Sequence, residues 1–308
     1  MSKLKTGIKA ILFEQNILFA KLIERTGFML DDSLYLKAIF RLIMGYSLNL
    51  DDPKTFSEKL QWLKLHDRNT LYTSLVDKYE VKNIIGREIG KDHIIPTLGI
   101  WDSVDDINFD SLPNQFVLKT TQGGGSMGVV ICKDKSKLDR QVCIANLRKG
   151  MKQNIYKSFR EWPYKGVKPR IMAEELMTQE DGSPLADYKF FCFNGEPKYV
   201  YLRHEEHGET KPRLSFMTMD WEIAPFHNPN YPQFETTPPM PVLFNEMKIM
   251  AKKMSKGHAF LRVDLYVING RIYFSELTFF PGSGMMILEP QEWDKKLGDM
   301  IDLRGIKQ

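Results

Sequence analysis

The stretch "RVDLYVINGRIYFSELT", from Arg262 to Thr278, decides the fold prediction. Two β-rich runs flank an Asn-Gly pair, which is the strongest short-range signal for a β-hairpin. The runs nevertheless carry Arg262, Asp264 and Glu276. Charged side chains are rarely buried without a partner, so the stretch predicts a half-buried hairpin that carries a polar site.

The length of the turn decides which faces these charges occupy, because side chains alternate along a strand. A strict two-residue Asn-Gly turn would pair Asp264 with Ser275. It would put the carboxylates of Asp264 and Glu276 on opposite faces of the hairpin. The two acids could then not share a ligand.

A three-residue loop over residues 268–270, with the glycine as the left-handed bulge residue, changes this arrangement. It pairs Arg262 with Glu276, pairs Asp264 with the phenylalanine ten residues later, and brings all three charges and Thr278 to one face. Carboxylates on neighbouring positions can hold one or two hard cations, and Mg²⁺ usually combines such carboxylates with phosphate oxygens. We expect this odd-length loop. The alternative is a surface ion pair between Arg262 and Glu276.

The composition is that of a globular protein without a dedicated nucleic-acid surface. The chain has 308 residues, of which 43% are hydrophobic, enough for one large domain or two to three smaller ones. Its 43 basic and 39 acidic side chains are spread along the sequence and leave a net charge of +4. Three cysteines without metal-type spacing favour a reducing cytosol, with Cys132 and Cys192 expected inside strands. We expect a cytoplasmic protein that does not bind nucleic acid.

Two segments raise other possibilities. Residues 7–25 are apolar but interrupted by charged and amide side chains, so they do not predict a membrane span. They leave open an amphipathic helix in peripheral contact with the inner membrane face. The histidines of "HEEHGE" (204–209) are three residues apart instead of the four of H-E-x-x-H, so no zinc site is predicted there.

The order of the expected elements predicts an α+β fold with antiparallel sheets in two lobes. Helices are expected before about residue 70, one of them opening after Pro53 with a Thr55–Glu58 capping box, and then over 75–89, 137–159 and 242–255. Strands are expected at 93–96, with "GIWDS" (99–103) as a loop, and at 115–119, 128–132, 170–176 and on both sides of "NGE" (194–196). We divide the chain into an N-terminal helical region (1–70), a small α/β unit (71–114), a small lobe (115–178) and a large lobe (179–308).

Two glycine-rich loops are candidates for anion or substrate contacts. In "KTTQGGGSMG" (119–128) the lysine precedes the glycines and a strand follows them, so the loop is neither a P-loop nor a Rossmann turn. It fits a loop that folds over nucleotide phosphates with Lys119 as counter-charge, or simply a mobile hairpin loop. In "FFPGSGM" (279–285), directly after the acidic strand, backbone N–H groups could meet a polar group of a substrate.

The order of these motifs resembles the ATP-grasp superfamily of carboxylate ligases. More closely, "LDDPKTFSEKLQWLKLHDRN", "REWPYKGVKPRI" and "DYKFFCFNGEPKYV" resemble the TupA-like ATP-grasp family, named for teichuronopeptide biosynthesis. The resemblance covers roughly residues 30–303. It implies two α+β lobes that enclose a nucleotide, preceded by an N-terminal helical region, with ATP and Mg²⁺ as cofactors.

The resemblance also implies roles for individual residues. Arg262 and Lys119 would be catalytic, and magnesium would bind Asp264, Glu276 and, more weakly, Thr278. Many superfamily members have an asparagine in place of Thr278, so one or two magnesium ions remain open. Gly282, Ser283 and Gly284 would contact the substrate. The implied ATP-binding residues are Lys78, Lys119, Gly123, Gly124, Gly125, Glu174, Glu175, Met177 and Lys189.

The implied activity is ATP-dependent ligation of a carboxylate to an amine through an acyl phosphate. The implied setting is cell-surface polysaccharide biosynthesis, with an amino acid joined to a sugar acid of a lipid-linked glycan. Two alternatives are a glycosyltransferase of the same pathway, for which the sequence has no D-x-D pair, and a non-catalytic nucleotide-binding scaffold.

Overall fold

The computed structural model describes residues 30–204 and 213–306, so the segment 7–25 and most of "HEEHGE" lie outside the described residues. The helices are α2 (Asp32–Met44), α3 (Phe56–His66), α4 (Leu71–Val76), α5 (Glu80–Ile89), α6 (Arg140–Met151), α7 (Ile155–Phe159), α8 (Phe244–Ser255) and α9 (Glu292–Asp299). Short 3-10 helices include η2 (Lys91–His93), η6 (Trp162–Gly166) and η7 (Pro281–Gly284). The strands are β1 (Thr97–Trp101), β2 (Phe116–Thr120), β3 (Val129–Cys132), β4 (Ile171–Glu175), β5 (Asp187–Phe193), β6 (Glu196–His204), β7 (Arg213–Thr218), β8 (Phe260–Ile268) and β9 (Arg271–Thr278).

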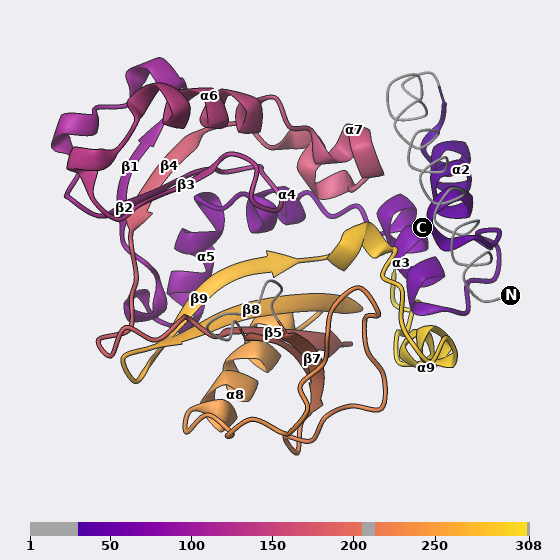
Figure 1. Ribbon diagram of the computed structural model, residues 1–308. Coiled ribbons are helices and arrows are strands. Elements are labelled where there is room, and N and C mark those ends of the chain that lie inside the picture. The colour runs from indigo at the N-terminus through magenta and orange to yellow at the C-terminus, as the bar shows by residue number, and fades with distance from the viewer. Residues whose placement is uncertain (1–29, 205–212, 307–308) are drawn as a thin grey trace, which may run out of the picture.

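Two antiparallel sheets form two lobes (Figure 1). The small sheet has the order β1-β4-β2-β3, and the large sheet has the order β7-β6-β5-β8-β9. Figure 1 shows α6 over the outer side of the small sheet and α8 against the large sheet, with α4 and α5 between the two sheets. The predicted α+β fold with antiparallel sheets in two lobes is confirmed.

Strand alternation decides which side chains of the small sheet face the other lobe. On β2, Phe116 and Leu118 are fully buried in a core that also contains Leu147 of α6. Val117 and Lys119 point to the opposite face of the sheet because side chains alternate with a period of two. Burial of each such Phe or Leu contributes roughly 1.5–3 kcal/mol, which fixes the register that exposes Lys119.

The N-terminal helices share the core of the large lobe. Thr55 and Glu58 form the predicted capping box at the start of α3. Phe56 is the first residue of α3. Its ring lies 4.9 Å from that of Phe260 on β8 and 6.0 Å from that of Phe193 on β5. The helical region is therefore packed onto the large sheet. The domain boundaries given above stay a prediction.

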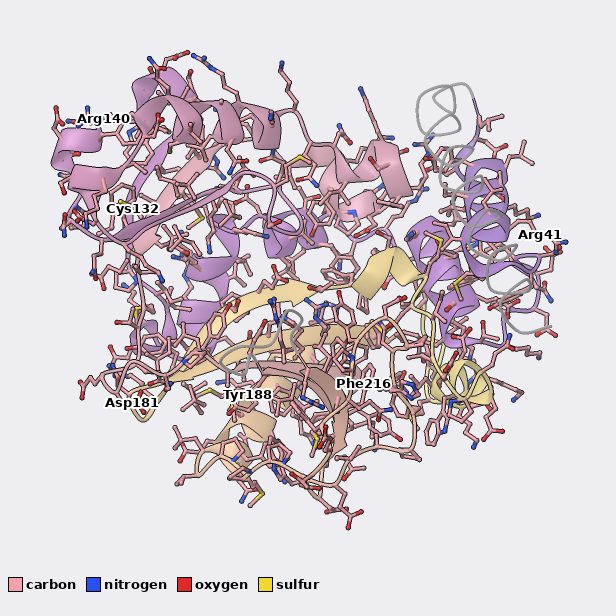
Figure 2. The ribbon with its side chains drawn as sticks, viewed as in Figure 1. Arg41, Cys132, Arg140, Asp181, Tyr188 and Phe216 are labelled. Carbon is pink, nitrogen blue, oxygen red and sulfur yellow. The ribbon has the colours of Figure 1, made fainter. Side chains whose placement is uncertain are left out.

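The side chains drawn in Figure 2 show the two cores. Cys132 lies in the small lobe, and Tyr188 and Phe216 lie in the large lobe. Phe216 of β7 stacks on Tyr201 of β6, with ring centroids 4.4 Å apart. The cysteines are buried free thiols, and Cys132 lies on a strand as expected. β7 itself was not predicted, because its flanks lie in a polar stretch with a weak strand pattern.

Several predicted elements differ from the observed ones. The helix expected over 75–89 is two helices, α4 and α5, because Asp77 accepts hydrogen bonds from the backbone of Tyr79 and Glu80 and starts a new helix. The strand expected at 93–96 begins at Thr97 and includes the glycine-containing segment expected as a loop. The helical stretch over 137–159 is divided between α6 and α7. The broken helix matters for function, since the break contains Lys78.

The hairpin on which the fold prediction rests has a shorter turn than expected. Ile268 pairs with Arg271, so the turn contains only Asn269 and Gly270. Both turn residues have positive φ, 49° and 74°, as a two-residue type I′ turn requires. The predicted three-residue loop is therefore wrong.

The irregular residue lies in the strand ladder instead of the turn. The pairing is regular as far as Leu265, which pairs with Phe274. It then shifts by one residue, so that Asp264 pairs directly with Glu276 and Ser275 is an extra residue of β9. This β-bulge restores the alternation that a two-residue turn alone would have broken. The expected common face for the two acids is confirmed by a different route, and the expected pairing of Asp264 with Phe274 is wrong.

One partly buried histidine gives the protein a predictable acid sensitivity. His258 packs against the rings of Tyr72 and Phe279, with centroids 5.2 and 5.4 Å away, and burial lowers its pKa to about 4. The unfolded chain therefore binds more protons than the native state between about pH 4 and 6.5, and stability falls as the pH drops through this window. We expect a loss of about 3 kcal/mol from this residue, and His258→Phe should flatten that part of the pH profile in urea unfolding. An unchanged profile in His258→Phe would contradict the assignment.

Candidate functional site

A cavity of about 380 Å³ lies between the two sheets and is called the interlobe cavity below. Its walls come from β2, β3 and β4 of the small sheet and from β5, β8 and β9 of the large sheet. Of the residues that the sequence singled out, those lining it are Lys78, Lys119, Gly125, Glu174, Glu175, Met177, Lys189 and Glu276. The fold thus brings together groups that are up to 198 residues apart in the sequence.

Three charged groups form the centre of the site. The guanidinium of Arg262 donates to both carboxylate oxygens of Asp264, over 2.7 and 2.6 Å, and to Oε1 of Glu276 over 3.0 Å. The prediction that Arg262 pairs with Glu276 in the ladder is wrong, because Arg262 pairs with Thr278. The Arg262 side chain is nevertheless long enough to reach Glu276, two residues away on β9. The Thr278 hydroxyl also lies 3.4 Å from Glu276 Oε1. The predicted cluster of Arg262, Asp264, Glu276 and Thr278 therefore exists in the structure.

Two lysines from other elements reach the same acids. Lys78, in the break between α4 and α5, lies 3.3 Å from Glu276 Oε2, and its backbone N–H donates to the carbonyl of Thr121. Lys189 of β5 lies opposite Asp264 in the ladder and donates to its Oδ2 over 2.9 Å. Asp264 is completely buried, while Glu276 keeps about 35% of its side chain exposed. Glu276 is thus the carboxylate that is open to a ligand.

The charges hold each other in their ionised forms. Burial alone would raise the pKa of Glu276, but the nearby charges of Lys78, Arg262 and Lys189 outweigh it and keep the pKa well below its usual range. Burial likewise opposes the charge on Arg262, but Asp264 and Glu276 raise its pKa above the ordinary value. Glu276 and Arg262 therefore stay ionised at neutral pH.

Asp187 is a site residue that the sequence reasoning missed. It lies two residues before Lys189 on the same face of β5, lines the interlobe cavity and forms an ion pair with Lys189. Its Oδ1 is buried and has no hydrogen-bond partner among the described residues. Burial raises the pKa of Asp187, and the charge of Asp264 adds to this effect. The period of two in "DYKF" was the signal that could have identified it.

Lys119 is paired with an acid on the neighbouring strand. The carboxylate of Glu174, on β4, is only 4% exposed and forms ion pairs with Lys119 and, over 2.5 Å, with Lys82 of α5. Burial would raise the pKa of Glu174, but the two lysines lower it. Lys82 was not predicted, and it also donates to the carbonyl of Ile95 over 2.7 Å. The ammonium of Lys119 thus has fewer partners among the described residues than that of Lys82, so Lys119 is better placed to turn toward a ligand.

The glycine-rich loop runs over the cavity from β2 to β3. Of its three central glycines only Gly125 lines the cavity; it has a φ of 68° and open space where a side chain would be. Gly124 is instead tied to the small lobe, because its N–H donates to the side chain of Gln153 over 3.3 Å. Gly123 packs against Thr120. The predicted role of all three glycines in phosphate binding stays a prediction.

The 3-10 turn η7 contains the residues expected to contact the substrate. Gly282 and Ser283 both have left-handed backbone conformations, with φ of 57° and 54°. For a non-glycine residue such as Ser283 this costs on the order of 1 kcal/mol, so the surrounding contacts must hold it. Those contacts come from Gln61 and Lys64 of α3, two residues that the sequence reasoning did not single out. They depend on tertiary packing and left no local signal.

The described residues were also compared with the patterns of metal sites and of membrane-spanning helices. They contain no group of three or more His, Cys, Asp or Glu side chains arranged to hold a metal ion by themselves. Over residues 30–204 and 213–306 no helix has the length and apolar character needed to cross a membrane.

Two antiparallel lobes that close on a cavity with lysines, a glycine-rich loop and a carboxylate pair define an ATP-grasp protein. A sequence model of the TupA-like ATPgrasp family matches residues 58–302. The chain therefore belongs to the TupA-like ATP-grasp family, as the sequence motifs predicted. The match begins inside α3, so part of the N-terminal helical region belongs to the family pattern.

Comparison with solved structures gives more distant similarities. The D-alanine–D-alanine ligase of Helicobacter pylori has 14% identity and a TM-score of 0.40, over 81% of this chain and 70% of that one. The ATP complex of the Bacillus anthracis D-alanine–D-alanine ligase has 17% identity and a TM-score of 0.41, over 74% and 63%. The ATP-grasp ligase PsnB has 13% identity and a TM-score of 0.40, over 80% and 66%. At these values the similarities carry no functional argument. A comparison with curated protein sequences found no match to this chain.

Proposed function

We propose that this protein is an ATP-dependent ligase that joins a carboxylate to an amine through an acyl phosphate. The observation that carries the proposal is the direct pairing of Asp264 with Glu276 across the bulged hairpin, with Arg262 bonded to both. Glu276 lines the interlobe cavity, and so do lysines from three other segments, Lys78, Lys119 and Lys189. A dense group of cations around two acids suits the transfer of a phosphoryl group, in which positioning and charge stabilisation supply most of the catalysis.

The donor set fits a magnesium ion. Glu276 offers a carboxylate that is partly open to the cavity, and the buried Oδ1 of Asp187 is an acceptor without a partner among the described residues. Glu276 and Asp264 would hold the ion, with the Thr278 hydroxyl as a weaker ligand, and Asp264 would exchange a hydrogen bond from Arg262 or Lys189 for the metal. Mg²⁺ typically needs only one or two carboxylates when phosphate oxygens complete its shell. When bound, the ion would neutralise charge on the β- and γ-phosphates.

The nucleotide would extend along the interlobe cavity. The lining includes the apolar side chains of Val117, Ile131, Leu176, Met177 and Leu185, which would suit a purine ring. Lys119, Gly125 and Lys189 line the same cavity and suit the phosphates. Glu174 is engaged with two lysines, so its proposed contribution is to orient Lys119 as well as to border the base.

In the proposed reaction a substrate carboxylate oxygen attacks the γ-phosphorus of ATP, and the bond from that phosphorus to the β-bridging oxygen breaks to release ADP. An amine nitrogen then attacks the acyl carbon, the bond to the phosphate oxygen breaks, and the amine loses a proton. Arg262 and Lys78 would stabilise the charge that develops on the transferring group. Closure of the glycine-rich loop would keep water from hydrolysing the acyl phosphate.

The proposed substrates follow the family resemblance. A sugar acid, on a lipid-linked glycan of the cell surface, would supply the carboxylate and an amino acid would supply the amine. This setting would suit a cytoplasmic protein near the inner membrane face.

ADP release tests the proposal directly. Purified protein with Mg-ATP should release ADP only when both a uronic acid, such as galacturonate or glucuronate, and an amino acid are present, and mass spectrometry should detect the amide. Chelation of magnesium should stop the release, because the phosphates would lose their counter-charge. Failure of every pair in a broad panel, with intact nucleotide binding, would favour the scaffold alternative.

A further inference from the structure

The turn η7 is held from behind by two side chains of α3. Gln61 donates from Nε2 to the carbonyls of Ser283, over 3.1 Å, and Gly284, over 2.8 Å. Lys64, one helical turn later, donates to the same Ser283 carbonyl over 2.8 Å and to Gln61 Oε1 over 2.9 Å. One face of α3 thus donates hydrogen bonds to two consecutive carbonyl groups of η7, the turn that contains the residues expected to contact the substrate.

The fit between α3 and the turn leaves no spare space. A side chain at Gly284 would place its first carbon 2.5 Å from Gln61 Nε2 and 3.0 Å from Leu60. Gly284 has a φ of 69°, so a glycine is required there on both conformational and packing grounds. The turn and α3 are therefore built against each other.

Lys64 is an unusual residue to find in this position. Its side chain is fully buried, and its ammonium also donates to the carbonyl of Phe159 over 2.9 Å. Burial lowers the pKa of Lys64 to about 8, with the charge of Glu161 acting in the opposite direction. A buried charge is weak evidence for stability, since well-packed apolar residues are often as good. Its presence next to a site is better explained by a requirement on geometry.

Glu161 connects this group of residues to the catalytic centre. It follows α7 and is only 6% exposed, and the charge of Lys64 and the Ser283 side chain both oppose the rise in its pKa that burial causes. The charge of Arg262 also acts on it. The turn is therefore held by α3, and the buried carboxylate of Glu161 is within electrostatic reach of Lys64 and of Arg262.

We propose that Lys64 and Gln61 are positioning residues that fix η7 in its left-handed conformation, which makes α3 a part of the substrate end of the site. The role in substrate binding rests on the proposed ligase function. The positioning itself does not. The N-terminal helical region is then a working part of the catalytic unit.

Hydrogen exchange tests the positioning without any substrate. In Lys64→Met, amides of residues 280–286 should exchange about tenfold faster or more, while amides of β4, which borders the nucleotide end, keep their wild-type rates. Lys59→Met is the matched control: Lys59 lies on the same helix and donates to two carbonyls, those of Gly298 and Ile301, both over 2.8 Å, but these belong to the α9 region. It should leave η7 unchanged. Equal rates in Lys64→Met and wild type, or the same acceleration in Lys59→Met, would overturn the proposal.

A second variant covers the case in which Lys64→Met does not fold. Gln61→Met keeps the length of the side chain and removes both donations to the turn without leaving a buried charge unpaired. It should accelerate exchange over the same residues 280–286. Folding of each variant is checked by urea unfolding, and unchanged exchange in folded Gln61→Met counts against the proposal.

Kinetics then tests the role in substrate binding. With whichever uronic acid the wild type accepts, Lys64→Met should raise the KM for the acid at least tenfold and leave the KM for ATP within about twofold, because α3 does not border the interlobe cavity. A purely structural role would alter neither constant selectively. If the wild type ligates nothing, the ligase proposal fails while hydrogen exchange still decides whether Lys64 positions the turn.

Discussion

Replacing Glu276 with Gln is expected to lower Mg-ATP turnover by about 10³-fold while the protein still binds the nucleotide. The amide oxygen can still accept from Arg262, so the hairpin should keep its shape. The substitution removes the negative charge that is open to the cavity. Glu276 is a better position than Asp264 for testing the metal assignment, because Asp264 is fully buried. Turnover is measured as ADP release, and binding as the affinity for a non-hydrolysable ATP analogue.

Glu196→Gln is a matched control. Glu196 lies on β6, forms an exposed ion pair with Lys252 and is far from the site in the ladder. It should turn over ATP at the wild-type rate. Wild-type turnover in Glu276→Gln would remove the metal assignment, and a loss in both variants would point to a general effect of charge.

Arg262→Lys is expected to lower turnover by about 10²- to 10³-fold with the fold intact. Lysine keeps the positive charge but cannot donate to Asp264 through two parallel bonds while also reaching Glu276, as the guanidinium does. The developing charge of the transferring group would lose a fixed donor. Steady-state kinetics with saturating ATP measures the effect, and circular dichroism with urea unfolding checks the fold.

Arg271→Lys makes the same exchange on the same hairpin. Arg271 lies at the start of β9 in a half-exposed ion pair with Asp92, so its replacement should leave turnover unchanged. Arg262→Met, in contrast, should also destabilise the fold by about 3–5 kcal/mol, because it leaves the buried Asp264 without its main partner. Full activity in Arg262→Lys would show that the bidentate contact has no role in the reaction.

The sequence predicts the hairpin, its charges and their common face, but not how that face is achieved. Eleven residues separate Asp264 from Glu276, and an odd number requires one irregular residue if the acids are to oppose each other. The alternation of side chains along a strand shows that an irregular residue is needed, but it does not show where in the hairpin that residue lies. The structure puts the irregular residue at Ser275, in the ladder, because Asn269-Gly270 alone satisfies a tight turn.

Residues near motifs were predicted better than residues brought in by packing. Lys119 was identified because it directly precedes a glycine-rich loop, and Lys189 because "DYKF" resembles a family motif. The helix over 75–89 was expected to be continuous, although the break at Asp77 is what turns Lys78 toward Glu276. Lys64 lies in a helix that is buried over most of its surface, and nothing in the local sequence reveals that its ammonium contacts a turn 219 residues away. Such contacts become visible only when the lobes are assembled.

The bulge at Ser275 also bears on how this hairpin can change in evolution. The irregular residue and the turn are separate, so the segment between them is an ordinary ladder that can lose or gain matched pairs of residues, one from each strand, without disturbing the acids. A single insertion in that segment would rotate every later side chain to the other face. Removal of Ser275 itself would not, because Glu276 would then follow Phe274 in regular register. The number of residues between the two acids can therefore change in steps of two. The one unpaired residue that makes this number odd is Ser275.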